Sequence, residues 1–526
     1  MIPMPIPNIC FADHQPHLIG EAWTAGGGET FHSTSPATGE RVWEAAAAAA
    51  ADVAAAVAAA RQAQAGWADR PVGERIRLLE AGAAELLAHG ADLHAAIVAE
   101  TGKPHWEVAT EIKAMAAKIP ATIDAWRERQ QDQVTTGDDG VAATRYRPHG
   151  VLAVIGPFNF PGHIPQGHIV PALLAGNTVV FKPSEFTPLA GRRLAEVWQR
   201  AGLPAGVLNL VQGGRETGAA LTTHPGHDGI LFTGSYRTGV ALRQALVAEP
   251  GKMLALELGG NNPLVVHDVQ NLDAAVRLTI LSAYLTAGQR CSCARRLVVT
   301  DFPGRGAFLD RLAATIDTIR VGLPEDQPEP FMGPVIHEAA AASLLAAQAD
   351  LLARGGVVIK RLQPLRGKPT LLAPGLIDVT DVADRPDTEW FGPLLQVIRV
   401  PDLDAAITEA NRTAYGLAAA LLCDKRADYE TFRRRVRAGL INWNRQTTGA
   451  SSRLPFGGLG HSGNHRPSGF HAIDSCSHPV ASLEQERLAL PPAVPGLESA
   501  AGSSRGPGRD RCGGRSRPSS GRRARD

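Results

Sequence analysis

The sequence predicts an α/β protein whose sheets are mainly parallel, and three observations lead to this prediction. Helical and strand-like hydrophobic patterns alternate along most of the 526 residues. From residue 149 onward, short apolar strand runs are repeatedly followed by helices, which is the order that βαβ units require. A hydrophobic content of 44% and a charged content of 20% are ordinary for a globular chain, and a chain of this length can bury a large core.

The region before residue 149 is mostly helical in pattern. Residues 52–129 contain long stretches with helical periodicity, interrupted at Gly102 and Pro104. The alanine-rich run 45–60 predicts a helix of a globular domain rather than a membrane span, because Asp52 interrupts it and can cap a helix. Residues 141–148 alternate in polarity, which indicates an exposed β-ribbon.

The region after residue 149 predicts βαβαβ units. Strands are expected in GVLAVIGP, TVVFKPSE, GVLNLVQG and GILFTGS, and helices in IVPALLAGN and LAGRRLAEVWQRAGLP. Ligands of such folds bind at the carboxyl ends of the strands. Lys182 and Glu185, which follow the second strand, therefore belong to the predicted ligand-binding edge. A second α/β region is expected from about residue 252 to 454.

Charge and cysteine content bear on several classes of function. The formal net charge is +1, with 53 Lys and Arg against 52 Asp and Glu, so nothing indicates a nucleic-acid or membrane partner. Six cysteines without a disulfide framework, and an N-terminus without a signal-peptide pattern, favour a cytoplasmic protein. The spacing of Cys291 and Cys293 does not suit zinc, so no metal site is predicted and Cys293 is expected to be a buried thiol. Residues 491–526, rich in Arg, Gly, Ser and Pro, are expected to be a disordered basic tail without a catalytic role.

Three side chains in short motifs suit catalysis. Cys291 in GQRC follows a helical run and can face a cleft, where positive charge or backbone dipoles would lower the pKa of its thiol. Glu257 in LELGG ends an apolar strand before a Gly–Gly bend, and burial raises the pKa of such a carboxyl into the range of a general base. Asn159 in FNFP lies in a tight turn where its amide can stabilise an oxyanion. Taken alone, the cysteine is better explained by core packing and the asparagine by capping of a turn, and a lone glutamate is usually a solvated surface group.

One further motif suits a phosphate group, and another pairs a carboxylate with an aromatic ring. FTGSYRTG, which contains Gly234, Ser235 and Gly239, follows a strand and opens a helix, so its backbone N–H groups can hold a phosphate. It does not have the G-x-G-x-x-G order of the usual dinucleotide fingerprint. TEWFGP places the carboxylate of Glu389 close to the ring of Phe391 on a loop.

Together these motifs resemble the aldehyde dehydrogenase superfamily. FNFP, KPSE, FTGS, LELGG, GQRC and FGP occur in the order of that family between residues 17 and 490. The resemblance implies a Rossmann-type NAD-binding domain, an α/β catalytic domain and a small β-ribbon element for oligomerisation. The implied boundaries are 14–134 with 149–256 for the NAD-binding domain, 257–455 for the catalytic domain, and 135–148 with 456–488 for the oligomerisation segments.

The resemblance also implies roles for the catalytic candidates. Cys291 would attack the aldehyde carbon, and the oxyanion would be held by the Asn159 amide and the backbone N–H of Cys291. After hydride transfer to the nicotinamide, Glu257 would activate water to hydrolyse the thioester.

The implied cofactor is NAD. Lys182 and Glu185 would bind the adenine ribose, and the Glu185 carboxylate would repel the 2′-phosphate of NADP. The cofactor would lie on the turn from Gly234 through Ser235 to Gly239. Glu389 and Phe391 would position the nicotinamide ribose and ring.

Longer segments resemble one branch of the family, which oxidises N-succinyl-L-glutamate 5-semialdehyde to N-succinyl-L-glutamate in arginine degradation. These segments are GHIPQGHIVPALLAGN and GNHRPS. This substrate carries two carboxylates, so cations are expected in the substrate tunnel. The candidate cations are His163, His168, Arg290, Arg295, Arg445 and Arg453.

Three alternatives remain open at this point. The enzyme could oxidise another anionic semialdehyde. An acyl-CoA-forming dehydrogenase is disfavoured by Glu257, because that chemistry replaces water with a thiol and typically has no general base. A non-catalytic protein that keeps the fold is the third alternative. A homodimer or homotetramer, paired through residues 141–148 and the segment 471–483, is implied by the resemblance.

Overall fold

The computed structural model describes residues 11–137, 140–488 and 494–497. These residues fall into two compact units, one formed by 1–133 with 144–481 and the other by 134–143 with 482–526. Apart from 494–497, the basic tail predicted for 491–526 lies outside the described residues. No helix in the part of the chain that the structure describes is long and apolar enough to cross a membrane.

The helical pattern of residues 52–129 is confirmed as four helices. They are α1 (Ala50–Ala68), α2 (Val72–His89), α3 (Ala91–Thr101) and α4 (His105–Arg129). The prediction that Asp52 is the N-cap of the first helix is wrong, since Ala49 occupies that position. Asp52 lies in the first turn, where its carboxylate accepts the Ala49 N–H at 2.8 Å and so satisfies a donor at the helix end.

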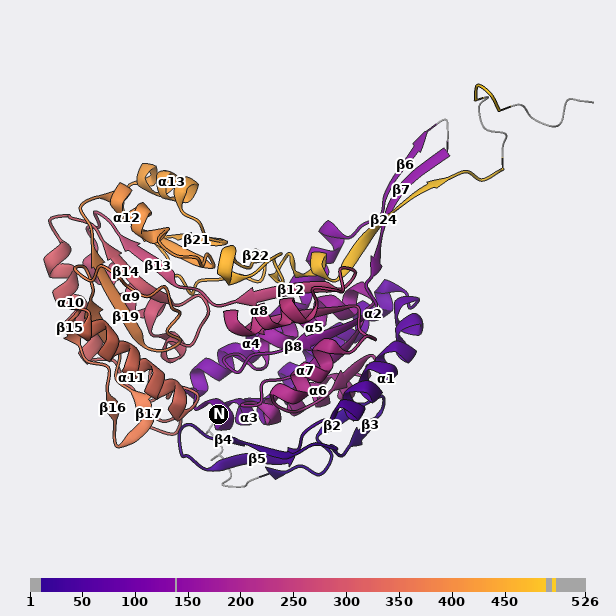
Figure 1. The fold of residues 1–526 in the computed structure, drawn as a ribbon, viewed down its shortest axis with the longest axis horizontal. Coiled ribbons are helices and arrows are strands. Elements are labelled where there is room, and N and C mark those ends of the chain that lie inside the picture. Colours follow the sequence, from indigo (N-terminus) through magenta and orange to yellow (C-terminus); the bar gives the residue numbers. More distant parts are fainter. Residues whose placement is uncertain (1–10, 138–139, 489–493, 498–526) are drawn as a thin grey trace, which may run out of the picture. The chain divides into compact units, whose positions relative to one another are not determined.

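The first large sheet contains the predicted βαβαβ units and is shown in indigo to magenta in Figure 1. Its central strands pair in parallel, whereas the two N-terminal strands β2 and β3 add an antiparallel edge. The strand order is β12 (Met253–Leu258), β11 (Gly229–Gly234), β8 (Val151–Ile155), β9 (Thr178–Lys182), β10 (Leu208–Leu210), β2 (His17–Ile19) and β3 (Ala22–Thr24). The helices of this region are α5 (His163–Ala175), α6 (Pro188–Arg200), α7 (Arg215–Thr223) and α8 (Tyr236–Ala245).

Helices cover both faces of this sheet. Alternate residues of β8 belong to two different core clusters: Leu152 and Val154 to one, Val151 and Ala153 to the other. Burial on both faces explains why these strands are continuous apolar runs in the sequence rather than alternating ones. The helix α5 ends at Gly176, as predicted, where φ is +99° and a residue without Cβ is favoured.

The second large sheet, pink to orange in Figure 1, confirms the second α/β region. All its strands pair in parallel except the edge strand β15. The strand order is β15 (Val357–Lys360), β18 (Gly375–Asp378), β19 (Leu394–Arg399), β14 (Ala294–Val299), β13 (Asn262–Val266), β20 (Ala418–Leu422) and β21 (Leu440–Trp443). Its helices are α9 (Leu272–Ala283), α10 (Arg305–Asp317), α11 (Glu338–Ala353), α12 (Leu403–Ala410) and α13 (Arg426–Arg435).

Four small sheets complete the described structure. They are β1 (Phe11–Ala12), β5 (Arg41–Ala46) and β4 (Thr30–Thr34); β16 (Pro364–Leu365) and β17 (Lys368–Leu372); β22 (Pro455–Phe456) and β23 (Ser468–Gly469); and β24 (Ser477–Glu484), β7 (Gly140–Pro148) and β6 (Gln133–Gly137). The residues expected to form a ribbon, 141–148, make up most of β7.

Candidate active site

A left-handed turn positions Cys291. The helical run expected before Cys291 is helical only in its first part, since the helix α9 ends at Ala283. In the following turn η1 (Leu285–Gly288), Thr286 and Ala287 have φ values of +57° and +51°. Residues with a Cβ adopt this conformation at a cost of about 1–3 kcal/mol each and keep it only where the surroundings enforce it.

Several buried polar groups hold this turn: the Thr286 hydroxyl donates to Glu107 and accepts from Arg290, and Arg295 binds the backbone on the carboxyl side of the turn. The fully buried guanidinium of Arg295 donates to the carbonyl oxygens of Gly288 at 2.6 Å, Arg290 at 3.0 Å and Gly392 at 3.3 Å. It does not line the cavity that contains Cys291. The prediction that Arg295 is a candidate substrate-binding cation is therefore replaced by a structural role.

Cys291 and Glu257 are in contact. The thiol donates to Oε1 of Glu257, with an Sγ–Oε1 distance of 3.3 Å. Glu257 lies on β12 and is 1% exposed. Its second oxygen accepts the hydroxyl of Thr233 at 3.1 Å, and that hydroxyl lies 2.8 Å from Nε2 of His168. Because the hydroxyl donates to Glu257, it accepts from the Nε2–H of His168.

The pKa shifts of this pair correct one expectation. Burial raises the pKa of Glu257, as predicted. The pKa of the Cys291 thiol is raised well above its ordinary value, by burial first and then by the adjacent Glu257 carboxylate. The expected lowering of the thiol pKa is wrong for the resting protein, since a second negative charge next to a buried carboxylate is disfavoured.

Asn159 lies in the loop after β8 and borders the same cavity, which has a volume of about 310 Å³. Its amide donates to the carbonyl oxygen of Gln289 at 2.9 Å, which leaves its second N–H for another acceptor. Within the described residues, the backbone N–H of Cys291 has no hydrogen-bond acceptor. A thiol, a carboxylate, an amide donor and a backbone donor thus meet in one cavity.

The cations expected in the tunnel are distributed differently from the prediction. His163 and Arg290 line the cavity. Arg290 is paired with the Glu107 carboxylate at 3.1 Å and stacks over the ring of Phe160 at 4.9 Å. The other four candidates are not among its described lining residues. They are His168, which binds Thr233; Arg295; Arg445, which is exposed; and Arg453, which pairs with Asp124 at 3.0 Å.

Two cofactor candidates lie together at the end of β9. The buried Lys182 ammonium donates to the carbonyl oxygen of Pro183 at 2.8 Å and lies 3.9 Å from the Glu185 carboxylate. The Glu185 side chain is 46% exposed. The motif FTGSYRTG opens the helix α8, as predicted, and Ser235 is its N-cap, whose hydroxyl accepts the Thr238 N–H at 3.2 Å.

Two further cofactor candidates, Glu389 and Phe391, lie on the loop before β19. Glu389 accepts the Gly260 N–H at 3.1 Å, and burial raises the pKa of its carboxyl to about 7. A Cβ at Gly259 would overlap this carboxylate, which explains the Gly–Gly bend after Glu257. The ring of Phe391 packs edge-on against Phe158 with centroids 5.9 Å apart.

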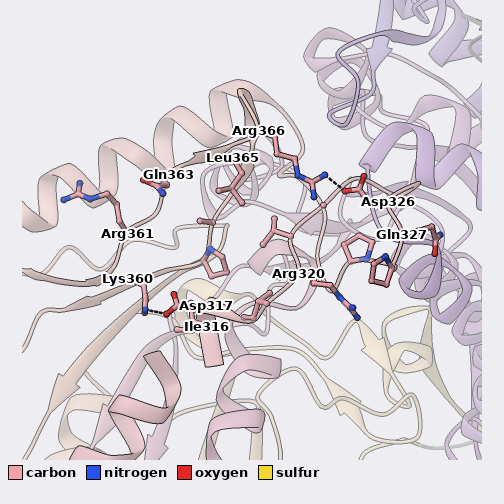
Figure 2. A pocket seen from close by; sticks show the side chains of 17 residues that line it. Ile316, Asp317, Arg320, Asp326, Gln327, Lys360, Arg361, Gln363, Leu365 and Arg366 are labelled. Atoms are coloured by element: carbon pink, nitrogen blue, oxygen red, sulfur yellow. Dashed lines mark hydrogen bonds and ion pairs between the residues drawn. The ribbon is translucent and has the colours of Figure 1, made fainter. Parts of the chain in front are cut away.

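A second cavity, of about 590 Å³, lies in the region of α10 and β15 (Figure 2). Two of its cations are already paired, Lys360 with Asp317 and Arg366 with Asp326. None of the seventeen described residues that line it carries a thiol, hydroxyl or imidazole group. The cavity that contains Cys291 is the one that holds the candidate catalytic groups Cys291, Glu257 and Asn159.

Comparison with known proteins decides the family. The model of the aldehyde dehydrogenase family matches residues 23–480. This chain belongs to that family. It is 53% identical over 485 residues to N-succinylglutamate 5-semialdehyde dehydrogenase of Pseudomonas fluorescens (strain Pf0-1), covering 92% of this chain and 99% of the relative. It is 52% identical over 482 residues to the protein of the same name from Ectopseudomonas mendocina (strain ymp), covering 91% and 99%.

Solved structures of the family resemble the fold closely. An NAD-dependent aldehyde dehydrogenase from Sinorhizobium meliloti has a TM-score of 0.86 at 31% identity, over 92% of this chain and 97% of that one. An NADP-dependent glyceraldehyde-3-phosphate dehydrogenase from Bacillus halodurans C-125, complexed with NADP, has a TM-score of 0.82 at 30% identity, over 89% and 98%. This aldehyde dehydrogenase is thus an oxidoreductase that uses a nicotinamide cofactor.

The residues at the strand ends fit such a cofactor. A buried ammonium beside a half-exposed carboxylate, at Lys182 and Glu185, offers a donor and an acceptor for sugar hydroxyls. The N-terminus of α8 at Ser235 offers backbone N–H groups for phosphate. The Glu389 carboxylate, accommodated by Gly259, is a buried acceptor for a second ribose.

The sequence prediction missed Lys118 and a row of hydroxyl groups. The hydroxyls that line the cavity belong to Thr110, Ser292, Thr448, Ser451, Ser452 and Ser468. Lys118 lies on the buried face of α4 with Glu111 and Met115. The sequence did contain a signal for Lys118. It follows Met115 by three residues and Glu111 by seven, and residues at these spacings lie on the same side of a helix.

Proposed function

We propose that this enzyme oxidises N-succinyl-L-glutamate 5-semialdehyde to N-succinyl-L-glutamate with NAD, as a step of arginine degradation. The observation that carries the proposal is the identity above 50% with two enzymes of that name over nearly the whole length of each. The contact between Cys291 and Glu257, with Asn159 in the same cavity, supplies the groups that the reaction needs.

The proposed roles of these groups follow from their hydrogen bonds. Glu257 first accepts the proton of the Cys291 thiol, which frees the sulfur to attack the aldehyde carbon. The second N–H of the Asn159 amide and the backbone N–H of Cys291 stabilise the oxyanion. The nicotinamide, when bound, accepts hydride. Glu257, again ionised, then accepts a proton from the water that hydrolyses the Cys291 thioester.

The cavity supports a substrate with anionic groups away from the aldehyde. Arg290 lies next to Cys291 in the chain, and its guanidinium has N–H groups beyond the one that binds Glu107. Thr448, Ser451 and Ser452 offer hydroxyl donors on one loop of the cavity wall. We assign these groups to the two substrate carboxylates.

We also propose that the cofactor is NAD rather than NADP. The Glu185 carboxylate, 3.9 Å from Lys182 at the end of β9, would repel a 2′-phosphate on the adenine ribose. We further propose a homodimer or homotetramer that pairs through β7 and β24, in the cytoplasm. The position of β24 supports the pairing, since it is an edge strand of the described sheet β24-β7-β6 and runs over eight residues.

The test is NADH formation, followed by absorbance, with a panel of aldehydes at equal NAD. The panel contains the semialdehydes of N-succinylglutamate, glutamate and succinate, and a simple aliphatic aldehyde. We expect kcat/KM for the succinylated substrate to exceed the others by about a hundredfold, which corresponds to ~2.7 kcal/mol of transition-state discrimination. A flat profile would refute the substrate and leave the second candidate, another anionic semialdehyde.

A further inference from the structure

Lys118 is a buried cation in the cavity that contains Cys291. Its side chain extends from α4 and is 6% exposed. It lines the cavity together with Cys291 and Glu257. The three groups come from α4, β12 and the loop after η1, so their proximity is a property of the fold rather than of one segment.

The ammonium group of Lys118 has few partners. It donates to one backbone carbonyl oxygen of α5 at the long distance of 3.5 Å, and no carboxylate of the described residues forms an ion pair with it. The other cations near the cavity are compensated. Lys103 is paired with Glu111 at 3.0 Å, and Arg290 with Glu107 at 3.1 Å. Burial of an unpaired ammonium costs several kcal/mol, so a lysine at this position indicates a function other than stability.

Glu257 is the acidic group on which the charge of Lys118 acts. That charge lowers the pKa of Glu257, against the larger raising effect of burial. Glu257 in turn raises the pKa of Lys118, which burial lowers to about 8. At neutral pH, Lys118 is therefore mostly a cation that faces a carboxylate without touching it.

The other groups around this pair do not supply the same charge. Burial and the charge of Lys118 lower the pKa values of His163 and His168, so both imidazoles are neutral. Hydrogen bonds from Thr233 and Ser468 favour the ionised form of Glu257, but they carry no net charge. The titratable and charged groups that face the pair are Lys103, Glu107, Glu111, His163, His168, Arg290, Cys291 and Glu389.

We propose that Lys118 is a positioning residue that keeps Glu257 ionised inside its buried site, so that the carboxylate can accept the proton of the hydrolytic water at neutral pH. The proposal rests on the proposed role of Glu257 as the base. Burial alone favours the neutral carboxyl, which cannot accept a proton. The unpaired ammonium reverses part of this effect without forming an ion pair that would hold the carboxylate away from water.

The experiment compares Lys118→Met with Lys113→Met, a control on the exposed side of the same helix. The rate of thioester hydrolysis is measured after a single turnover of a neutral aldehyde such as hexanal, from about pH 5.5 to 9. We expect Lys118→Met to raise by about one unit the apparent pKa of the acid limb, the low-pH side of the profile of hydrolysis rate against pH. Hydrolysis should then slow about tenfold at pH values below this apparent pKa and little above it. Lys113→Met should match the wild type, and Lys118→Arg should restore part of the shift.

The possible results are separable. An acid limb that does not move in Lys118→Met overturns the proposal. So does a rise confined to KM for anionic semialdehydes, which would assign the lysine to substrate binding. If Glu257→Gln hydrolysed the thioester at the wild-type rate, the role of Glu257 as the base would be wrong. If Glu257→Gln were slow but the acid limb of Lys118→Met did not move, only the role of Lys118 would be refuted. Lys118→Met should fold, since it removes a buried charge, and Lys118→Gln provides a second variant.

Discussion

Replacing Arg295 by methionine tests whether the left-handed turn before Cys291 determines the position of the thiol. The substitution removes three hydrogen bonds from a charged group to the carbonyl oxygens of Gly288, Arg290 and Gly392. Such bonds contribute roughly 1.5–3 kcal/mol each. Removing the buried guanidinium offsets part of this loss, although it also takes a positive charge away from the Glu389 carboxylate 3.9 Å from it. We expect the free energy of unfolding to fall by about 3–5 kcal/mol.

The functional effect should exceed what lower stability alone produces. Without the guanidinium, Thr286 and Ala287 can leave their strained conformation, and Cys291 then moves away from Glu257. A displacement of about 1 Å can slow a reaction by about a hundredfold. The burst of NADH should slow by this factor, and alkylation of Cys291 without cofactor should accelerate about tenfold, because the burial and the carboxylate that raise its pKa are relieved.

Arg75→Met provides the matched control. Arg75 is also buried and also donates three hydrogen bonds to backbone carbonyl oxygens, those of Ala68, Arg70 and Leu174, far along the chain from Cys291. Urea unfolding should show a similar loss of stability in both variants. Peptide mass mapping should show faster alkylation of Cys291 in Arg295→Met alone. A wild-type burst and a wild-type alkylation rate in Arg295→Met would refute the role of the turn.

Three further outcomes follow from the described contacts. Glu257→Gln should lower turnover by about 10²–10⁴-fold and leave acylated Cys291 as the main species in mass spectra of the quenched reaction; a free thiol there would place the base only before acylation. Gly259→Ala, which would push a Cβ into the Glu389 carboxylate, should raise KM for NAD at least about tenfold, whereas Gly251→Ala, with open space around it, should not. The pKa of His17 is lowered to about 4 by burial, so its neutral form stabilises the fold above the unfolded pKa of 6.5. That stability, about 3 kcal/mol, is lost as pH falls from 6.5 toward 4, and urea midpoints of His17→Gln should depend less on pH over that range.

Local patterns predicted the elements of the fold because they depend on nearby residues. The strand β8, the helix α5 and its end at Gly176 follow from apolar runs and one glycine. The meeting of Asn159, Glu257 and Cys291 in one cavity required more than periodicity, and the order of motifs that resembles a family supplied it. The antiparallel edge formed by β2 and β3 had no pattern to predict it, since each strand has only three residues.

Features that depend on distant partners could not be predicted from the sequence. Nothing in LTAG marks Thr286 and Ala287 as left-handed, because the groups that bind this turn, Glu107, Arg290 and Arg295, come from other parts of the chain. Arg295 has the residue type of a substrate-binding cation, and only its hydrogen bonds to carbonyl groups reveal its structural role. The direction of the thiol pKa shift likewise depends on one distance, 3.3 Å between Cys291 and Glu257.

The raised pKa of the Cys291 thiol constrains the order of proton transfers in the proposed reaction. A protonated thiol that donates to Glu257 is a poor nucleophile, so the resting enzyme is protected from attack by oxidants. The sulfur becomes reactive when Glu257 takes its proton. The same carboxylate must then lose that proton before it can activate water. The acid limb of hydrolysis therefore reports on the ionisation of Glu257, whereas the rate of acylation reports on the proton that Cys291 and Glu257 share. If Glu257→Gln slowed acylation but left hydrolysis of the thioester unchanged, the two steps would not share a base, and the double role of Glu257 would be wrong.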